Sequence, residues 1–317
     1  MIVTLTANPS LDRTLGLAGP LRPGAVQAAT GSREDAGGKG INVARVLSAA
    51  GAEAVAVLPL AVGDPFDSAL RATGIEARRV AVRGNVRANL AITDPAGVTT
   101  KLNLPGVTLS ADEADALVRA VVDVCAGARW LVLAGSLPPG VADGFYVDVI
   151  DAVRAAHGAH APSIAVDTSG AALTAVVERG RPDLIKPNDE ELAELTRTQL
   201  PTGDLARSVA ELARTIVPSH VGSALVTLGS RGAVLVSADG AWIVAAPVID
   251  VVSTVGAGDS SLAGYLLAEV VGADPGERLR SAVRYGAAAA SLPGTQAPAP
   301  ADLPPGDLYV TPLSLAT

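Results

Sequence analysis

The sequence predicts an α/β protein: a mostly parallel sheet flanked by helices on both faces, with a small accessory β-sheet, called the lid below. From 111 to 227, helical and strand patterns alternate strictly, which is typical of a parallel sheet with helices on both faces. The candidate motifs fall in loops that follow predicted strands, where such sheets bind ligands. Short antiparallel patterns at 15–30 and between 80 and 102 indicate the small accessory sheet.

The N-terminal third supplies the first strands of the sheet and most of the lid. Ile2–Ala7 is an apolar run that ends at Asn8 and Pro9, and it predicts a buried strand. Leu11–Thr30 alternates briefly around Gly-Pro and Pro-Gly pairs, which predicts one or two exposed lid strands. We then expect a helix at Val43–Ala50, a strand at Ala54–Leu60, a helix at Phe66–Thr73, and antiparallel lid strands at Val80–Val82, Arg87–Thr93 and Val98–Leu102.

The rest of the chain is predicted to alternate between helices and strands. Helices are expected at Ala111–Cys125, Phe145–Ala156, Ala171–Glu178, Glu190–Thr196, Leu205–Ile216, Leu262–Val271 and Gly276–Leu292. Strands are expected at Trp130–Ala134, Ile164–Asp167, Leu184–Lys186, Ala224–Thr227, Pro247–Val252 and in a hairpin of Ala233–Ser237 and Trp242–Ala246. The Pro/Ala-rich tail Gln296–Thr317 predicts irregular structure.

Composition excludes several classes of function. The 317 residues carry a net charge of −8, which argues against nucleic acid as a partner and requires a local positive patch for any anionic substrate. With one cysteine, Cys125, and three histidines, neither an internal disulfide nor a His/Cys metal cluster is expected. The start lacks the basic region of a signal peptide, and no apolar run reaches transmembrane length. We therefore expect a cytoplasmic protein without a membrane partner.

A glycine-rich turn, Thr254–Asp259, lies between a predicted strand and a predicted helix. Unpaired N–H groups and the positive end of a helix dipole make such a turn a site for an anion. A carboxylate there favours chemistry: Asp259 would take a proton from a hydroxyl while the amides of Gly256, Ala257 and Gly258 hold charge arriving on a phosphoryl group. For the motif alone, an N-cap and a shaped turn are the better interpretation.

Two stretches near the N-terminus offer polar groups for a ligand. Asp12 follows the first strand, where its carboxylate would accept hydrogen bonds from hydroxyls, although a turn aspartate is an equal alternative. Gly37, Gly38, Lys39 and Asn42 open a helix: the glycines allow close approach of a ligand, the lysine supplies charge, and the asparagine bridges two hydroxyls. A flexible loop with a solvated lysine is the weaker alternative here.

The lid and one strand-to-helix loop add further candidates. Arg87 and Asn89 lie in a predicted lid strand beside Lys101, and an arginine there would fork onto a phosphate. Exposed strand charges are the alternative, and they would be favoured without context. The rigid loop Gly135–Gly140 contains Ser136 but lacks the glycine of a nucleophile elbow, so it is predicted to shape a pocket.

The stretch Lys186–Glu191 has two interpretations. Asn188 stands as a helix cap with Glu191 three residues later, which is the spacing of a capping box. Alternatively, both side chains hold water around a Mg²⁺ carried by ATP phosphates.

Three of these motifs together resemble the signatures of the ribokinase-like carbohydrate kinases, the PfkB family. They are Gly37–Asn42, the Lys-Pro-Asn-x-x-Glu pattern of Lys186–Glu191, and Val255–Asp259, and the resemblance runs in order over about 1–295. Asp250–Ser260, Gly135–Gly140, Asp167–Gly170 and Lys39 resemble the branch that acts on ketohexose phosphates. Family members that act on fructose 6-phosphate tend to carry glycine at the position of Lys39, whereas tagatose-6-phosphate kinases share the lysine.

The resemblance implies a doubly wound α/β domain of residues 1–13, 36–83 and 105–317, with a small β lid of residues 14–35 and 84–104 over the sugar site. It also implies an ATP- and Mg²⁺-dependent kinase that forms homodimers through its lid. Its first expected substrate is fructose 1-phosphate, giving fructose 1,6-bisphosphate, and the alternatives are tagatose 6-phosphate and fructose 6-phosphate. Asp259 would be the catalytic base, beside an anion hole of Gly256, Ala257 and Gly258. The expected substrate residues are Asp12, Gly37, Gly38, Lys39, Asn42, Arg87, Asn89, Lys101 and Ser136; the expected ATP residues are Lys186, Asn188, Thr227, Gly229, Gly232 and Ser291; and Asn188 and Glu191 would hold Mg²⁺ through water.

Two departures and two rival functions complete the prediction. Relatives usually place Thr-Arg before the lid asparagine, whereas Val86 precedes Arg87 here, which predicts an altered phosphate pocket. Many relatives bind K⁺ with an aspartate where Ser253 stands, which argues against K⁺ activation. A dinucleotide-dependent reductase is disfavoured because Ser261 replaces the third glycine of its fingerprint. A non-catalytic sugar-phosphate sensor would not need Asp259.

Overall fold

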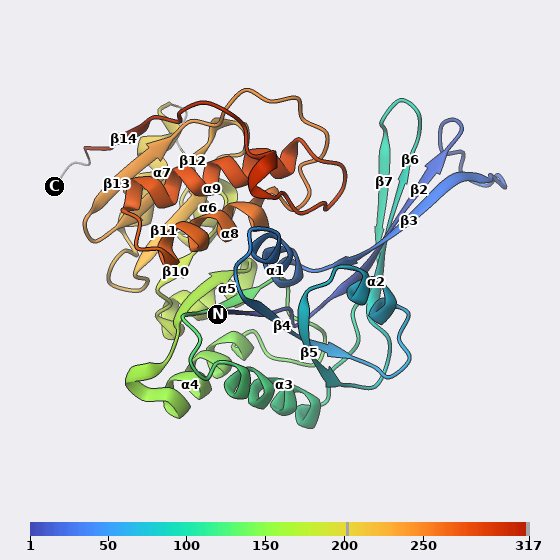
Figure 1. Cartoon of the computed structure of the whole chain (residues 1–317), viewed down its shortest axis with the longest axis horizontal. Coiled ribbons are helices and arrows are strands. Elements are labelled where there is room, and N and C mark those ends of the chain that lie inside the picture. The colour runs from blue at the N-terminus through green and yellow to red at the C-terminus, as the bar shows by residue number, and fades with distance from the viewer. Residues whose placement is uncertain (201–202, 315–317) are drawn as a thin grey trace.

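The computed structural model describes residues 1–200 and 203–314, and it contains two sheets. A sheet of ten strands forms the body, and a second sheet of four strands projects from one side of it (Figure 1). In the described part of the chain, no helix combines the length and apolar character needed to cross a membrane. The architecture is the predicted mixed α/β fold with a separate small sheet.

The large sheet has the order β14-β13-β12-β11-β10-β9-β8-β1-β4-β5. The pairs from β11 to β5 are parallel, and the pairs among β11, β12, β13 and β14 are antiparallel. The order reverses direction at β1, so the ends of β1 and β8 mark the point where doubly wound sheets bind ligands. The strands are β1 (Ile2–Leu5), β4 (Ala54–Leu60), β5 (Glu76–Ala81), β8 (Trp130–Ala134), β9 (Ser163–Asp167), β10 (Leu184–Ile185), β11 (Ser223–Thr227), β12 (Ala233–Ser237), β13 (Gly240–Val244) and β14 (Val310–Pro312).

Helices cover both faces of this sheet (Figure 1). Alternate strand residues serve the two sides: Leu131 belongs to the core with α3 to α7, and Val132 to the core with α1, α2, α8 and α9. Both residues are fully buried, as a central parallel strand requires. The helices are α1 (Lys39–Ala49), α2 (Phe66–Ala72), α3 (Ala111–Val124), α4 (Phe145–His157), α5 (Gly170–Ala175), α6 (Asp189–Leu195), α7 (Leu205–Arg214), α8 (Ala257–Val270) and α9 (Pro275–Ala290).

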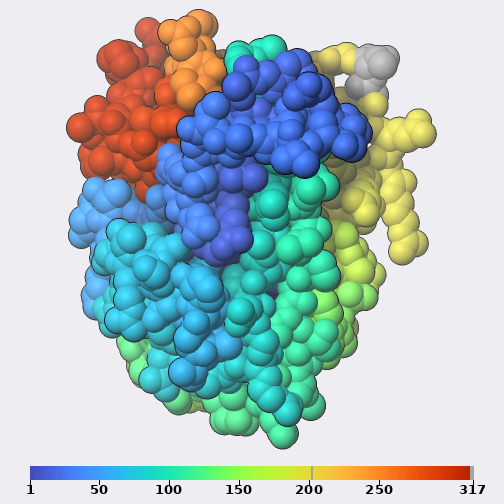
Figure 2. All heavy atoms as spheres, turned by 90° about the vertical axis from the view of Figure 1, so that its right-hand side faces the viewer, coloured from blue at the N-terminus to red at the C-terminus, as the bar shows by residue number. Residues whose placement is uncertain are grey.

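The small sheet, hereafter the lid, has the order β3-β2-β6-β7. Its strands are β2 (Ser10–Leu17), β3 (Ala29–Gly37), β6 (Arg87–Thr93) and β7 (Thr99–Asn103). β2 begins before and β3 ends after the predicted range 14–35, so Asp12 lies in a strand rather than in a loop. In Figure 2, which views the molecule from the lid side, the blue residues of these first two strands stand in front of the body.

Several predicted elements differ from the structure. The helices predicted from Val43 and from Leu262 begin earlier, at Lys39 and at Ala257. Pro247–Val252 forms no strand, and Val252 instead donates its backbone N–H to the Ala290 carbonyl at the end of α9. Val80 belongs to β5, which pairs in parallel with β4 at the edge of the large sheet and not with the lid. The tail contains a strand, because β14 pairs with β13. The helix predicted at 171–178 ends as α5 at Ala175 and continues as the π-helical turn Val176–Gly180.

Candidate functional site

A buried charged cluster lies at the carboxyl edge of the large sheet. Asp167, the last residue of β9, is fully buried between two lysines. Its Oδ1 lies 2.8 Å from Nζ of Lys39 and its Oδ2 lies 3.1 Å from Nζ of Lys186. Burial alone would raise the pKa of Asp167, but the positive charges of Lys186 and Lys39 outweigh it and lower the pKa. The cluster therefore carries a net positive charge, which the acidic chain needs to bind an anion.

Asp259 lies in the first turn of α8 beside this cluster. Its side chain is 6% exposed, and its Oδ2 accepts a 2.8 Å hydrogen bond from Nδ2 of Asn42 on the neighbouring helix α1. Burial and the negative charge of Asp167 raise the pKa of Asp259 to about 6, although Asn42, Lys39 and Lys186 favour its ionised form. A carboxylate with this pKa is ionised at pH 7 and basic enough to accept a proton from a hydroxyl.

The two helices that begin at this cluster both start at a glycine without a side-chain cap. Gly38 precedes α1 with a φ of 130°, and Gly256 precedes α8 with a φ of 79°. Such angles suit glycine, and an absent cap leaves first-turn amides without a side-chain acceptor. Side chains cap α3, α6, α7 and α9, whereas α4 and α5 also begin without a side-chain cap. The first turn of α8, with Ala257 and Gly258, can therefore donate N–H groups to an anion.

The glycines of this region are also required by packing within the protein. A Cβ on Gly38 would lie 2.5 Å from Cγ2 of Thr6, and one on Gly37 would collide with the carboxylate of Asp12. The close approach that the sequence predicted for a ligand is therefore already made by Thr6 and Asp12 of the protein itself. A Cβ on Gly258 would lie 3.2 Å from Nζ of Lys186, so the start of α8 closely approaches that ammonium group.

A second polar group lies where the lid joins the body. β2 and β6 pair in parallel, which sets Asp12 opposite Asn89. Oδ1 of Asp12 accepts hydrogen bonds from Oγ of Ser10 at 2.8 Å and from Nδ2 of Asn89 at 2.9 Å. Burial raises the pKa of Asp12, although both hydrogen bonds and the charge of Arg87 oppose this. This group offers a carboxylate and an amide to a polar ligand.

Arg87 is held at the same junction with part of its donor capacity unused. Its Nη2 donates to the Asn8 carbonyl at 3.4 Å, and its buried Nε has no hydrogen-bond partner among the described residues. Burial lowers the pKa of Arg87, which Asp12 partly offsets. A half-buried guanidinium with an unpaired N–H is suited to bind an incoming oxyanion.

Ser136 and Lys101 have different relations to this group. Oγ of Ser136, in the loop after β8, accepts a 3.3 Å hydrogen bond from Nδ2 of Asn8, so the loop joins the same site. Lys101 is exposed on β7 opposite Ala91, which places it on the lid face that Asn89 shares but one row farther from the body. Among the described residues, no hydrogen bond or ion pair connects Lys101 with the other candidates.

The predicted nucleotide side is built on the start of α6. Asn188 and Glu191 form the capping box: Asn188 Oδ1 accepts from the Glu191 amide at 2.7 Å, and Glu191 Oε2 accepts from the Asn188 amide at 2.9 Å. One oxygen of the Glu191 carboxylate is left outside this box. Burial lowers the pKa of Lys39, but the negative charges of Asp167, Asp259 and Glu191 outweigh burial and raise it. Asn188 also bridges to Thr227 at the end of β11.

The remaining nucleotide candidates, Gly229, Gly232 and Ser291, have structural roles of their own. Gly229 begins a 3₁₀ turn with a φ of 59°, and a Cβ on Gly232 would collide with the Val244 carbonyl. Ser291 ends α9, where its Oγ donates to the Ala287 carbonyl at 3.2 Å. Glycine is thus needed at 232 for packing against β13.

The sequence prediction missed two site residues. It includes Asp167 only as part of a motif, yet the Asp167 carboxylate joins Lys39 to Lys186. It includes Asn8 only as the end of a strand, yet the Asn8 side chain donates to Ser136 and to the Leu137 carbonyl, and its own carbonyl accepts from Arg87. The available signal was a polar residue at the carboxyl end of a buried strand: Asp167 ends β9, and Asn8 follows the predicted strand Ile2–Ala7.

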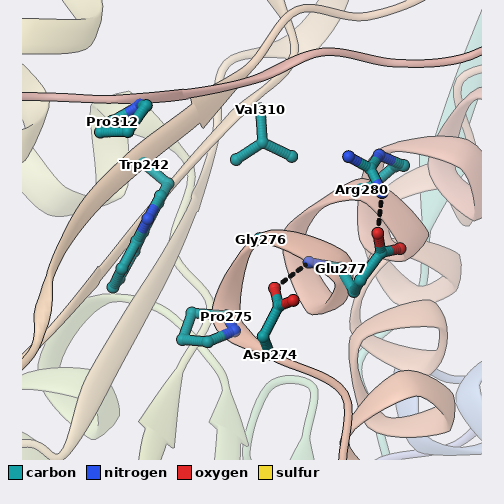
Figure 3. A pocket seen from close by; sticks show the side chains of 8 residues that line it. All are labelled: Trp242, Asp274, Pro275, Gly276, Glu277, Arg280, Val310 and Pro312. Carbon is teal, nitrogen blue, oxygen red and sulfur yellow. Dashed lines mark hydrogen bonds and ion pairs between the residues drawn. The ribbon is translucent and has the colours of Figure 1, made fainter.

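A separate pocket of about 350 Å³ lies between the start of α9, β13 and β14 (Figure 3). The Trp242 indole forms one wall, and Glu277 pairs with Arg280 on the other side. Asp274 caps α9 by accepting from the Glu277 amide, so carboxylates occupy the helix start. None of the candidate site residues lines this pocket, and its acidic rim does not favour a phosphate.

Comparisons with known proteins cover nearly the whole chain. Residues 10–302 match the model of the pfkB family carbohydrate kinases. The 1-phosphofructokinase of Rhodobacter capsulatus is 37% identical over 305 residues, which are 94% of this chain and 93% of that protein. The ATP-dependent 6-phosphofructokinase isozyme 2 of Escherichia coli is 32% identical over 93% of this chain and 94% of that protein. A crystal structure of phosphofructokinase-2 from Escherichia coli in complex with potassium superimposes with a TM-score of 0.87 at 32% identity, covering 95% and 96% of the two chains.

Proposed function

The chain belongs to the pfkB family of carbohydrate kinases and is a sugar-phosphate kinase, and from this premise we propose that it phosphorylates fructose 1-phosphate. The products are fructose 1,6-bisphosphate and ADP. The observation that carries the kinase assignment is the ionisable Asp259 in the uncapped first turn of α8, beside Lys39 and Lys186.

We assign the substrate's phosphate to the junction of lid and body. Arg87 supplies the fork of donors that suits a phosphate, and its unpaired Nε supports this role. Asp12, Asn89 and Ser136 bind sugar hydroxyls, and Asn42, whose Oδ1 is unpartnered within the described residues, holds a hydroxyl next to Asp259. Lys101 adds a long-range positive charge on the same lid face. The backbone of Gly37 and Gly38 borders this sugar site.

The transfer step uses the groups around Asp259. Its carboxylate accepts the proton of the primary hydroxyl as the hydroxyl oxygen bonds to the γ-phosphorus and the bond to the β,γ-bridging oxygen breaks. The amides of Gly256, Ala257 and Gly258 stabilise the negative charge on the phosphoryl group in transit. Lys39 contributes positive charge between substrate and nucleotide, held in place by Asp167. Such preorganised charges account for most of the catalysis in phosphoryl transfer.

The nucleotide is assigned to the ends of β10 and β11. Lys186 neutralises phosphate charge, and Asn188, Thr227, Gly229, Gly232 and Ser291 border the nucleotide. Asn188 and Glu191 would hold Mg²⁺ through water, which fits the free carboxylate oxygen of Glu191 and the preference of Mg²⁺ for oxygen and retained water. When bound, the ion neutralises charge on the phosphates.

We propose that this kinase works without K⁺. An Escherichia coli relative was crystallised with potassium, but Ser253 here offers a hydroxyl in place of a carboxylate, and that hydroxyl already accepts from the Val255 amide at 3.3 Å. Rates in KCl and in NaCl of equal ionic strength should agree within about twofold, since no charged ligand orders the cation. Strong activation by K⁺ would contradict the proposal.

The geometry accepts more than one ketohexose phosphate. Fructose 1-phosphate presents its 6-hydroxyl to Asp259, whereas fructose 6-phosphate and tagatose 6-phosphate present their 1-hydroxyls. The 37% identity to a 1-phosphofructokinase over 94% of the chain favours fructose 1-phosphate. Fructose 6-phosphate is the second candidate, because a 6-phosphofructokinase is similar at 32%.

We also propose a homodimer formed through the lid and a cytoplasmic location, where ATP is abundant. The outer lid strand β7 and its flanks expose Val98, Leu102 and Leu104, and an exposed apolar edge strand favours pairing with another chain. Sedimentation equilibrium of the protein and of a Leu102→Lys variant tests the dimer: a monomeric native protein would contradict it.

ATP consumption tests the proposed function. Purified protein should release ADP from Mg²⁺-ATP when fructose 1-phosphate is added, and Asp259→Asn should not. A protein that binds the sugar phosphate but releases no ADP would instead be a sugar-phosphate sensor.

A further inference from the structure

We propose that Asp64 is a positioning residue that fixes the base of the lid so that Arg87 meets the substrate's phosphate. The inference rests on the proposed function, since it assumes that Arg87 binds this phosphate. Asp64 lies in the turn after β4 and belongs to none of the motifs that predicted the site.

The Asp64 carboxylate is buried and bound to two different segments. The residue is only 5% exposed. Its Oδ1 accepts from the Phe66 amide at 2.9 Å, at the start of α2, and its Oδ2 accepts from the Val86 amide at 2.6 Å. Within the described residues it has no ion pair, so these N–H groups are its compensation for burial.

The hydrogen bond between Asp64 and the Val86 amide lies directly before the start of the lid strand β6. Val86 directly precedes Arg87, and Arg87 is the residue of β6 that pairs with Ser10 where β2 and β6 begin. Fixing the Val86 amide therefore fixes the backbone from which the Arg87 side chain extends. The other oxygen joins this point to α2, which packs against β2 and β3 at the base of the lid (Figure 1).

A carboxylate is the side chain that this position requires. Asp accepts at both oxygens, whereas Asn has one acceptor and would turn an NH₂ group toward one of the two amides. Serine would still cap the start of α2 with its single hydroxyl but would not reach Val86 as well. Asp64→Ser therefore separates the bond to the lid from the bond to the helix.

The test is a double-mutant cycle between Asp64 and Arg87. Losing one charge-assisted contact to the lid should raise KM for fructose 1-phosphate about 10-fold in Asp64→Ser, with KM for ATP and kcat within about twofold of native. Asp64→Asn should have the same effect. The control is Asp67→Asn on helix α2, which breaks ion pairs with Arg71 of the same helix and with Arg79 of β5 and should leave both KM values unchanged. In Arg87→Ala, adding Asp64→Ser should raise KM little further, because the two residues act as one unit.

Each outcome decides the inference. Additive effects in the double variant, equal changes in both KM values, or a native KM in both Asp64 variants would overturn it. Thermal melts of each variant identify a general loss of folding, which would lower activity toward ATP and sugar phosphate together and would count against a positioning role. Native protein that turns over no phosphosugar would contradict the proposed function itself, whereas turnover that depends on Arg87 but not on Asp64 would contradict only this inference.

Discussion

Replacing Asp259, the proposed catalytic base, should make this protein more stable while it loses activity. Asp259 is 6% exposed and lies next to the buried anion Asp167. Its pKa is about 6, against 3.8 for an unperturbed aspartate. A pKa shift of one unit corresponds to about 1.36 kcal/mol, so the shift from 3.8 to about 6 means that keeping Asp259 ionised at pH 7 costs the folded state up to about 3 kcal/mol. The side chain introduced by Asp259→Asn would carry no charge, and its amide oxygen would still accept from Asn42.

The sign of this stability difference follows from the pH at which the folded and the unfolded protein each bind a proton at Asp259. Between pH 4 and 6 the folded protein protonates Asp259 while the unfolded chain does not, so the penalty is complete above about pH 6 and vanishes below about pH 4. Urea unfolding should show Asp259→Asn to be more stable than native protein by about 1–3 kcal/mol at pH 7, with a smaller difference at pH 4.5. Turnover should fall by about 10²–10⁴-fold. A variant that is equally or less stable at pH 7, or a difference independent of pH, would refute this electrostatic reasoning.

The same cluster determines the response to pH and to other substitutions. Because Asp259 must be ionised, kcat/KM should fall about tenfold per pH unit below about pH 6, after the substrate phosphate's own titration is measured by ³¹P NMR and divided out; a flat profile down to pH 5 would rule out this base. Asp167→Asn leaves Lys39 and Lys186 without their anion, so it should lower the free energy of unfolding by about 3–5 kcal/mol and shift the acid limb to lower pH. Arg87→Ala should raise KM for the sugar phosphate by about 10- to 150-fold, equivalent to about 1.5–3 kcal/mol, and leave KM for ATP nearly unchanged; the opposite pattern would mean that the two substrates are assigned to the wrong ends.

The sequence predicted the layered fold because alternating patterns are local. Each buried strand is a short apolar run, and helix starts such as the Asn188–Glu191 capping box are contained in a few residues. The strand predicted at Pro247–Val252 failed for a reason that is not local. The outer edge of β13 is already paired with β14, which comes from the tail, and 247–252 instead approaches the end of α9. Only the folded structure shows that β14 already occupies the edge of β13 where 247–252 would have to pair.

The candidate site was predicted as residues rather than as contacts. Asp259 at a glycine-rich helix start was identified from the motif, and the structure adds its partner Asn42, 217 positions away in the chain. The role of Asp167 depends on two lysines from different elements, one of them 128 positions away. No local pattern indicates such an ion pair. The glycines at 37 and 38 were interpreted as ligand contacts, because sequence does not show that Asp12 and Thr6 pack against them.

The central claim, a kinase that prefers fructose 1-phosphate, is tested most directly by kcat/KM for three sugars measured side by side with Mg²⁺-ATP. The sugars are fructose 1-phosphate, fructose 6-phosphate and tagatose 6-phosphate, and the ratio of their kcat/KM values measures discrimination between competing substrates. We expect fructose 1-phosphate to have the highest value and fructose 1,6-bisphosphate to accumulate with ADP in equal amounts. A clear preference for either 6-phosphate would contradict the substrate assignment.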